Sequence, residues 1–178
     1  MLSFYQFLLE KTGHSYSSTQ VNLPVELANK MKKWGRGEIL NADLHGKEDL
    51  GREDNIHITI RYGLIADDID KVRQIVQNER PISLTIGKTS IFINNPEFDV
   101  VKFNITSSDL HSLNKKLKKC EHDDLHPKYV PHCTIAYVKK GLGRQHVGSN
   151  PFVGTKVMVN NIIFSDRKRN HTIIQLKG

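Results

Sequence analysis

The sequence predicts an α+β fold with two pseudo-symmetric lobes, each an antiparallel sheet with helices outside, and a central cleft between them. A His-x-Thr-Ile-x-Tyr hexapeptide occurs twice, at residues 57–62 and 132–137. Helical and extended segments alternate without the regular single-strand rhythm of a doubly wound sheet. The chain has 178 residues, 38% of them hydrophobic, which is enough for one sizeable core. We therefore expect one domain over residues 1–178.

The first third of the chain predicts an arm, a strand and a helix. Residues 1–13 contain an apolar stretch and predict an N-terminal arm or short helix. Alternating residues over 16–23 predict a strand. Pro24 suits the first turn of the following helix, which we expect to end at Gly35 and Gly37. The expected buried stripe of this helix is Leu27, Ala28, Met31 and Trp34.

The middle of the chain predicts a loop, a helix and a hairpin. Residues 41–55 are polar and acidic, which indicates a loop before the first hexapeptide. Asp67 can cap the helix after that hexapeptide, and Pro81 marks its end. Two extended runs at 82–93 and 98–105 are separated by an Asn-Asn-Pro-Glu turn. We expect these runs to pair as a hairpin.

The last part of the chain predicts a helix before the second hexapeptide and strands after it. Ser107 or Ser108 can cap this helix, whose leucines recur at helical spacing. Residues 141–151 predict a glycine-containing loop. The extended stretches 156–165 and 172–176 predict a final strand pair.

Composition narrows the environment and the partners. The formal charge of +7 and pI near 9.4 favour a polyanionic partner such as a nucleotide or nucleic acid. Two cysteines are too few for a disulfide scaffold and suit a reducing cytosol. Cys120, His122 and His126 fit no familiar zinc spacing, so we expect no metal. No segment reaches the ~18 apolar residues of a membrane span and no leader is evident, which predicts a cytoplasmic protein without a membrane partner.

Each hexapeptide predicts a strand with a polar, chemically active face. Both copies are rich in β-branched residues, which favour strands. Side chains alternate along a strand, so His57, Thr59 and Arg61 are expected on one face. His132 and Thr134 are expected on the corresponding face of the second strand. Two such strands facing one another would bring two imidazoles and two hydroxyls into one cleft.

This set of groups matches the needs of phosphodiester cleavage. The reaction requires a base, an acid and donors for the charged phosphate oxygens. Two histidines supply the first two near neutral pH, and two threonines supply the third, so no cofactor is required. A ribonucleotide also carries its own nucleophile, the 2′-hydroxyl. One histidine on a strand is typically structural, but its duplication with a matching threonine predicts His57, Thr59, His132 and Thr134 as catalytic.

Other candidate residues leave two interpretations open. Arg61 either contacts phosphate or base or forms a surface ion pair. Arg144 either meets a phosphate from the 141–151 loop or lies in an ordinary surface loop. Tyr16 either stacks on a base or only begins a strand. Tyr62 and Tyr137 fall on the face opposite the histidines and are expected in the core.

The paired His57-x-Thr59 and His132-x-Thr134, with Pro131 before the second histidine, resemble the 2H phosphoesterase superfamily. The resemblance covers most of the chain. It implies the bilobal α+β fold, metal-independent phosphodiester chemistry, and acid and base roles for the two histidines.

Within that superfamily, residues 16–24, 51–54, 57–63 and 129–139 are most similar to phage anti-CBASS proteins, which degrade cyclic oligonucleotide signals of a bacterial immune system. This resemblance implies hydrolysis of 3′,5′ linkages in cyclic di- or trinucleotides, and host cytosol as the location. An RNA-processing enzyme acting on 2′,3′-cyclic phosphate ends or 2′-5′ linkages is an alternative. A non-catalytic nucleotide-binding or RNA-binding module is another.

Overall fold

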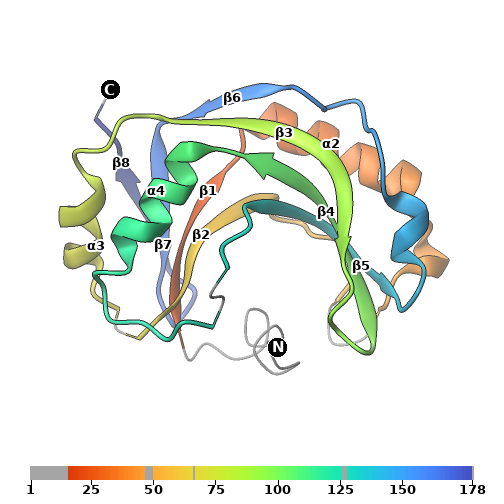
Figure 1. The fold of residues 1–178 in the computed structure, drawn as a ribbon, viewed down its shortest axis with the longest axis horizontal. Helices are drawn as coiled ribbons and strands as arrows, with labels where there is room; N and C mark the ends of the chain where they lie inside the picture. The colour runs from red at the N-terminus through yellow and green to blue at the C-terminus, as the bar shows by residue number, and fades with distance from the viewer. Residues whose placement is uncertain (1–15, 47–49, 66, 126–127, 178) are drawn as a thin grey trace.

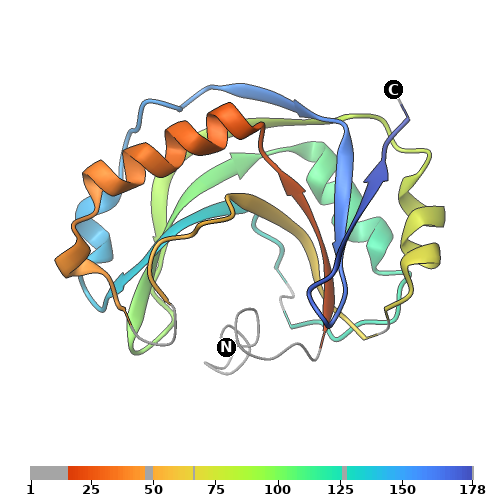
Figure 2. The same ribbon diagram turned by 180° about the vertical axis from the view of Figure 1, so that it is seen from behind.

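The computed structural model describes residues 16–46, 50–65, 67–125 and 128–177. The predicted arm at 1–13 lies outside this part of the chain. The described residues form two antiparallel four-stranded sheets and three α-helices, which confirms the predicted α+β class. Figures 1 and 2 show the two sheets as an arch with the helices on its outer side. None of these helices is long and apolar enough to cross a bilayer.

Each hexapeptide forms the edge strand of one sheet. Sheet A contains, in spatial order, β2 (His57–Leu64), β1 (Ser17–Asn22), β7 (Asn161–Ser165) and β8 (His171–Gln175). Sheet B contains β5 (His132–Lys139), β4 (Phe98–Thr106), β3 (Ile82–Phe92) and β6 (Lys156–Val159). The edge strands β2 and β5 contact one another, so the two sheets meet along the hexapeptides.

The C-terminal strands belong to both sheets. The predicted extended stretch 156–165 is divided at Asn160, because β6 pairs with β3 in sheet B while β7 pairs with β1 and β8 in sheet A. The predicted final pair is therefore confirmed for β7 with β8 but not for β6. The backbone N–H of Leu176 donates to the carbonyl of Asn160 at 2.9 Å, at the point where the chain changes sheets.

The helices are α2 (Val25–Glu38), α3 (Ile69–Val76) and α4 (Ser108–Leu117). Side chains cap α3 and α4, whereas Pro24 precedes α2 without a side-chain cap. The Asp68 carboxylate accepts from the backbone N–H of Lys71 at 3.0 Å, so α3 is capped one residue later than the predicted Asp67. The Ser107 hydroxyl accepts from the backbone N–H of Leu110 at 3.1 Å, which confirms one of the two predicted caps of α4.

Helix α2 continues past both glycines of its predicted end, Gly35 and Gly37. Gly35 is buried inside the helix, and a Cβ atom there would lie 2.6 Å from Cγ2 of Ile135 on β5. The glycine is required by close packing of helix on strand, and it does not terminate the helix. The helix ends only at Glu38.

One continuous apolar core joins the two sheets and the helices. It includes Val21 and Ile58 from sheet A, and Val101 and Phe103 from sheet B, all fully buried. Trp34 of α2 packs against this core, with its ring centroid 5.2 Å from that of Phe103. Burial of this apolar surface holds the hexapeptide strands against one another.

Candidate active site

Each hexapeptide strand has a β-bulge directly after its threonine. In β2, Thr59 pairs with Gln20 but Arg61 pairs with Thr19, so Ile60 is the additional residue. A bulge of this kind shifts the alternation of side chains by one residue. Accordingly Ile60 is fully buried and Arg61 is only 4% exposed, although the two are consecutive.

The same bulge occurs at the matching position of β5. Thr134 pairs with Lys102 and Ala136 pairs with Val101, which makes Ile135 the additional residue. Ile135 and Ala136 are both buried. The two hexapeptides therefore share a backbone irregularity as well as a sequence.

The bulges place the hexapeptide tyrosines on the same face as the histidines. Tyr62 pairs with Ser18, and Thr59 pairs with Gln20. Because Ser18 and Gln20 are two residues apart on β1, they and their partners face the same side of the sheet. The same reasoning through β4 applies to Tyr137. The prediction that the tyrosines oppose the histidines is wrong, because strict alternation cannot anticipate a bulge. The prediction of a core position is confirmed for Tyr137, which is 4% exposed and belongs to an apolar cluster with Phe98. We call the side that carries His57 and Thr59 in sheet A, and His132 and Thr134 in sheet B, the motif face.

Arg61 points away from the motif face as a consequence of the bulge. Its partner Thr19 is fully buried, and the Arg61 guanidinium forms an ion pair with Asp124 at 3.2 Å. The structure therefore does not bring Arg61 together with His57, contrary to the prediction that they share a face. Of the two interpretations of Arg61, the ion pair is the one observed, although the arginine is buried and does not lie at the surface.

The two catalytic candidates are held in the same orientation. Nδ1 of His57 lies 2.6 Å from the carbonyl oxygen of Asn55, and Nδ1 of His132 lies 2.8 Å from that of Val130. A carbonyl oxygen only accepts, so Nδ1 carries the proton in each bond. In the neutral ring Nε2 is then the nitrogen that can accept a proton. Both histidines are half-buried.

Contacts between the two strands bring the half-sites together. The thiol of Cys133 is fully buried, and burial raises its pKa, while the nearby backbone N–H of His57 acts in the opposite direction. The Tyr129 hydroxyl donates to the carbonyl of Thr59 at 2.9 Å. The residue between His132 and Thr134 therefore contacts the backbone that starts the first motif strand.

A polar pair on β1 extends the half-site of sheet A. Asn22 stands directly opposite His57, and Gln20 stands directly opposite Thr59. The Gln20 side-chain amide donates to Oδ1 of Asn22 at 3.0 Å. Both side chains lie on the motif face because they pair with residues of that face.

The half-site of sheet B has the same arrangement on β4. Asn104 stands opposite His132, and Lys102 stands opposite Thr134. Nζ of Lys102 donates to Oδ1 of Asn104 at 2.9 Å. The repeated unit is therefore larger than the hexapeptide, and our sequence reasoning missed this part. The signal was a polar-apolar-Asn tripeptide, Gln-Val-Asn at 20–22 and Lys-Phe-Asn at 102–104.

Tyr16 lies beside the motif face of sheet A. Its ring centroid is 5.8 Å from that of Tyr62, which the bulge places on this face. The Tyr16 hydroxyl donates to the Asp123 carboxylate at 2.5 Å, and this hydrogen bond raises the pKa of Tyr16. The structure thus brings Tyr16 to the edge of the candidate site.

Arg144 lies on the other side of sheet B. It belongs to a short 3-10 helix, Gly143–His146, that follows β5. A Cβ at Gly143 would lie 2.7 Å from Cβ of Asp99 and 3.1 Å from Ile91. Asp99 is an odd number of residues from Lys102 on β4, and therefore faces away from the motif face. The structure does not bring Arg144 to the histidines.

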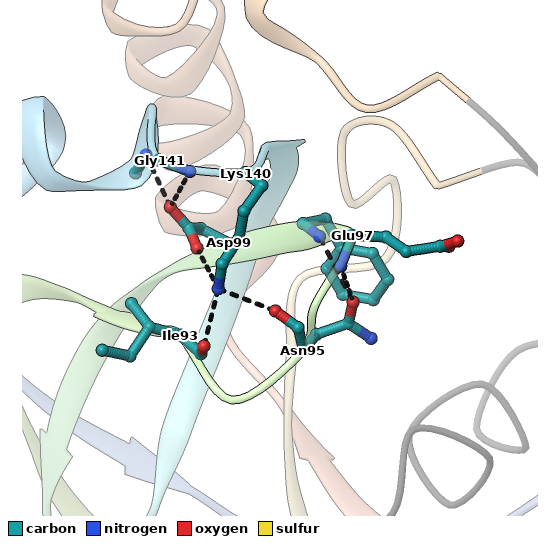
Figure 3. A network of polar contacts seen from close by, with 8 residues as sticks. Ile93, Asn95, Glu97, Asp99, Lys140 and Gly141 are labelled. Carbon is teal, nitrogen blue, oxygen red and sulfur yellow. Dashed lines mark hydrogen bonds and ion pairs between the residues drawn. The ribbon is translucent and has the colours of Figure 1, made fainter.

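A polar network anchors the loop that carries Arg144 (Figure 3). The buried Asp99 accepts from the backbone N–H of Gly141 at 2.9 Å and of Gly143 at 3.1 Å, and pairs with Lys140 at 3.1 Å. Lys140 also donates to the carbonyl of Ile93 at 2.7 Å. These contacts hold the start of the 141–151 loop against the hairpin of β3 and β4.

The cysteine and histidine cluster is only partly described. Nδ1 of His122 lies 2.7 Å from the carbonyl oxygen of Cys120, and His126 lies outside the described residues. Within the described ranges, no three His, Cys, Asp or Glu side chains are grouped to hold a metal ion.

Two antiparallel sheets whose adjoining edge strands each carry His-x-Thr define a phosphoesterase of the 2H class. Residues 24–145 match the family model described as the 2′-5′ RNA ligase superfamily, which is more than half of the chain. The chain belongs to this superfamily and is a 2H phosphoesterase. Among curated protein sequences, no relative matches.

Solved structures share the fold at low sequence identity. Usb1 of Kluyveromyces marxianus has a TM-score of 0.63 and 8% identity, covering 92% of this chain and 99% of that one. TT0787 of Thermus thermophilus has a TM-score of 0.60 and 14% identity, covering 90% and 95%. E. coli LigT complexed with phosphate has a TM-score of 0.58 and 16% identity, covering 92% and 98%. The similarity extends over both sheets.

Proposed function

We propose that this protein is a metal-independent phosphodiesterase that cleaves the 3′,5′ linkages of cyclic di- or trinucleotides. One observation carries the catalytic part of this proposal. His57 and His132 begin neighbouring strands, each with Nδ1 bound to a carbonyl, and each with a threonine two residues along on the same face. Family membership supports phosphodiester chemistry.

In the proposed reaction the two histidines act on opposite oxygens of one phosphate. Nε2 of one imidazole removes the proton from the ribose 2′-hydroxyl while the O2′–P bond forms. The other imidazole, protonated, donates to the 5′-oxygen as the P–O5′ bond breaks. Thr59 and Thr134 donate to the non-bridging oxygens, where negative charge develops. The product is a 2′,3′-cyclic phosphate, which water opens with the two histidine roles exchanged.

The cyclic oligonucleotide substrate is supported by what surrounds the motif strands. Residues 16–24 and 51–54 carry the resemblance to anti-CBASS proteins, and both segments contact a hexapeptide strand. Tyr16 lies against Tyr62. The carbonyl of Gly51 accepts from the backbone N–H of Tyr137 at 2.9 Å. These segments border the site where the nucleotides on either side of the cleaved linkage would lie.

An RNA-end substrate is the second candidate. The family whose model matches is described as the 2′-5′ RNA ligase superfamily. The structure of E. coli LigT has been solved in complex with 3′-AMP. A 2′,3′-cyclic phosphate at an RNA end is the same group that water opens in the second step of the proposed reaction. The same histidines and threonines would serve it.

A parallel cleavage assay tests the proposal. The full chain is incubated with cyclic dinucleotides, cyclic trinucleotides, RNA with 2′,3′-cyclic phosphate ends and 2′-5′-linked RNA, each with excess EDTA. Cleavage of a cyclic oligonucleotide, and none of its 2′-deoxy analogue, is expected. Cleavage of the RNA substrates alone would favour the second candidate. Tight binding without cleavage of any substrate would leave a non-catalytic binding module.

A further inference from the structure

Lys102 is a buried cation in the half-site of sheet B. It is 3% exposed, and its Nζ donates to the Ser90 hydroxyl at 2.7 Å and to Oδ1 of Asn104 at 2.9 Å. Both acceptors are uncharged, and within the described ranges no carboxylate pairs with this ammonium. Burial lowers the pKa of Lys102 to about 8, so the group is charged at neutral pH. A buried charge without a counter-ion destabilises a folded protein unless an anion binds beside it.

The ammonium is adjacent to the catalytic candidates. Lys102 stands directly opposite Thr134 across the strand pair. Nζ lies 4.3 Å from the centroid of the Phe92 ring, and that ring lies 4.8 Å from the imidazole of His132. One phenyl ring therefore contacts both the ammonium and the histidine. Because the ring excludes water, the attraction between Nζ and an anion in the site is weakly screened.

Sheet A provides an internal comparison for the charge. Gln20 occupies the equivalent position, opposite Thr59, and makes the equivalent hydrogen bond to Asn22. A neutral amide is thus sufficient to hold the asparagine of a half-site. The positive charge of Lys102 is not needed for that purpose, and it distinguishes the half-site of sheet B from that of sheet A.

We infer that Lys102 supplies the counter-charge for the substrate phosphate, which is therefore held toward sheet B and not midway between the two half-sites. This inference rests on the proposed function. It adds Lys102 to the two histidines and two threonines proposed to act on the phosphate. It makes the two histidines inequivalent, because His132 belongs to the sheet that carries the cation and shares the Phe92 ring with it.

Substitution by the residue of the other half-site tests this inference. Lys102→Gln reproduces Gln20, and Lys156→Gln is the matched control, since it removes the same charge from an exposed position on β6 of the same sheet. The affinity for 3′-AMP is measured by calorimetry at pH 7 in low salt. We expect the Kd to rise about 10-fold to 100-fold in Lys102→Gln. It should stay within about twofold of wild type in Lys156→Gln.

Urea unfolding of the free proteins distinguishes a ligand role from a structural one. If the charge serves a ligand, Lys102→Gln will be as stable as wild type or more stable, because it removes a buried charge that no carboxylate of the described residues neutralises. A less stable variant with weakened binding would contradict the inference and indicate a packing role. Unchanged 3′-AMP affinity in Lys102→Gln, or no 3′-AMP binding by wild type, would also overturn it.

The outcomes also separate this inference from the proposed function. Unchanged binding in Lys102→Gln, together with cleavage that depends on both histidines, would remove Lys102 from the site and leave the phosphodiesterase intact. Binding that depends on Lys102, without cleavage of any assayed substrate, would retain the phosphate site and refute the enzymatic proposal.

Discussion

At the scale of single residues, two backbone carbonyls set the chemistry of the candidate site. Asn55 and Val130 each accept from Nδ1 of the histidine two residues later. Each ring is thereby oriented and restricted to one neutral tautomer, with Nε2 available for proton transfer. The same local bond in both strands explains how two distant parts of the chain present imidazoles in the same neutral tautomer.

Removal of either imidazole should abolish most of the turnover. We expect His57→Ala and His132→Ala each to lower kcat by about 10² to 10⁴, the usual contribution of a general acid or base. Single-turnover kinetics on the cleaved nucleotide measure the effect. His171→Ala, at an exposed position of β8, is the control and should retain wild-type rates. Wild-type rates in either catalytic variant would refute the acid and base assignment.

The buried ammonium of Lys102 predicts a pH dependence of stability. Its pKa is lowered to about 8 by burial, whereas the unfolded chain retains the ordinary value of 10.5. Between these values the unfolded chain binds a proton that the folded protein does not, so stability increases with pH across this window. In the part of the chain that the structure describes, the groups that contact Nζ are Ser90, Asn104 and Phe92, none of them charged.

Urea titrations of wild type and Lys102→Gln from pH 7 to pH 10.5 measure this effect. The titration of all other groups is common to both proteins, so it cancels in the difference between their free energies of unfolding. We expect wild type to gain stability relative to the variant above about pH 8. A constant difference across the whole range would show that Lys102 is not desolvated.

At the scale of elements, the helices support the bulges of the motif strands. Helix α2 packs on β5, where Gly35 lies against Ile135, and α4 packs on β2, where the Asn114 side chain donates to the carbonyl of Ile60 at 2.6 Å. Each helix therefore contacts the additional residue of one bulge. The bulges in turn determine which side chains reach the motif face.

The two glycines of α2 should respond oppositely to alanine. A Cβ at Gly35 meets Ile135 at 2.6 Å, so Gly35→Ala should lower the free energy of unfolding by about 1 to 3 kcal/mol. A Cβ at Gly37 meets nothing within 4 Å, so Gly37→Ala should raise it by up to about 1 kcal/mol. Urea unfolding compares the two variants. Equal effects would contradict the proposed packing of α2 on β5.

The hydrogen bond of Asn114 should stabilise both the fold and the site. Asn114→Ala leaves the Ile60 carbonyl without this partner, and we expect a loss of about 1 to 3 kcal/mol of stability. We also expect a lower kcat/KM because the bulge follows Thr59. Ser112→Ala, exposed on the same helix, should change stability by less than about 0.5 kcal/mol. An Asn114→Ala protein with full activity would show that the bulge does not position Thr59.

At the scale of the whole molecule, the two halves of the structure, sheet A and sheet B with their helices, are built from interleaved parts of the chain. Strands β1, β2, β7 and β8 of sheet A come from both ends of the described chain, with all of sheet B between them. The core is continuous across the two sheets. Neither half can bury its apolar face without the other, which is the physical basis for expecting one domain.

A single cooperative unfolding transition is therefore expected. Trp34 is the only tryptophan of the chain and packs against Phe103 of sheet B, so its fluorescence reports on the core. Far-UV circular dichroism reports on both sheets and the helices. The two signals should give coincident urea transitions. A separate fluorescence transition would indicate that the halves unfold independently.

The sequence by itself determined the fold class, most of the elements and the candidate catalytic residues. These depend on local signals: hydrophobic periodicity, the Ser107 cap, and a hexapeptide that occurs twice. Local periodicity could not reveal the bulges after Thr59 and Thr134, because a bulge exists only relative to a partner strand. The inward turn of Arg61 follows from the same cause.

Only the tertiary structure decided which distant residues complete the half-sites. It placed Lys102 and Gln20 beside the threonines of strands about 30 to 40 residues away, and it placed Arg144 behind sheet B. It also assigned β6 and β7 to different sheets. Such choices depend on which apolar faces are buried together, a property of the assembled core and not of any segment alone.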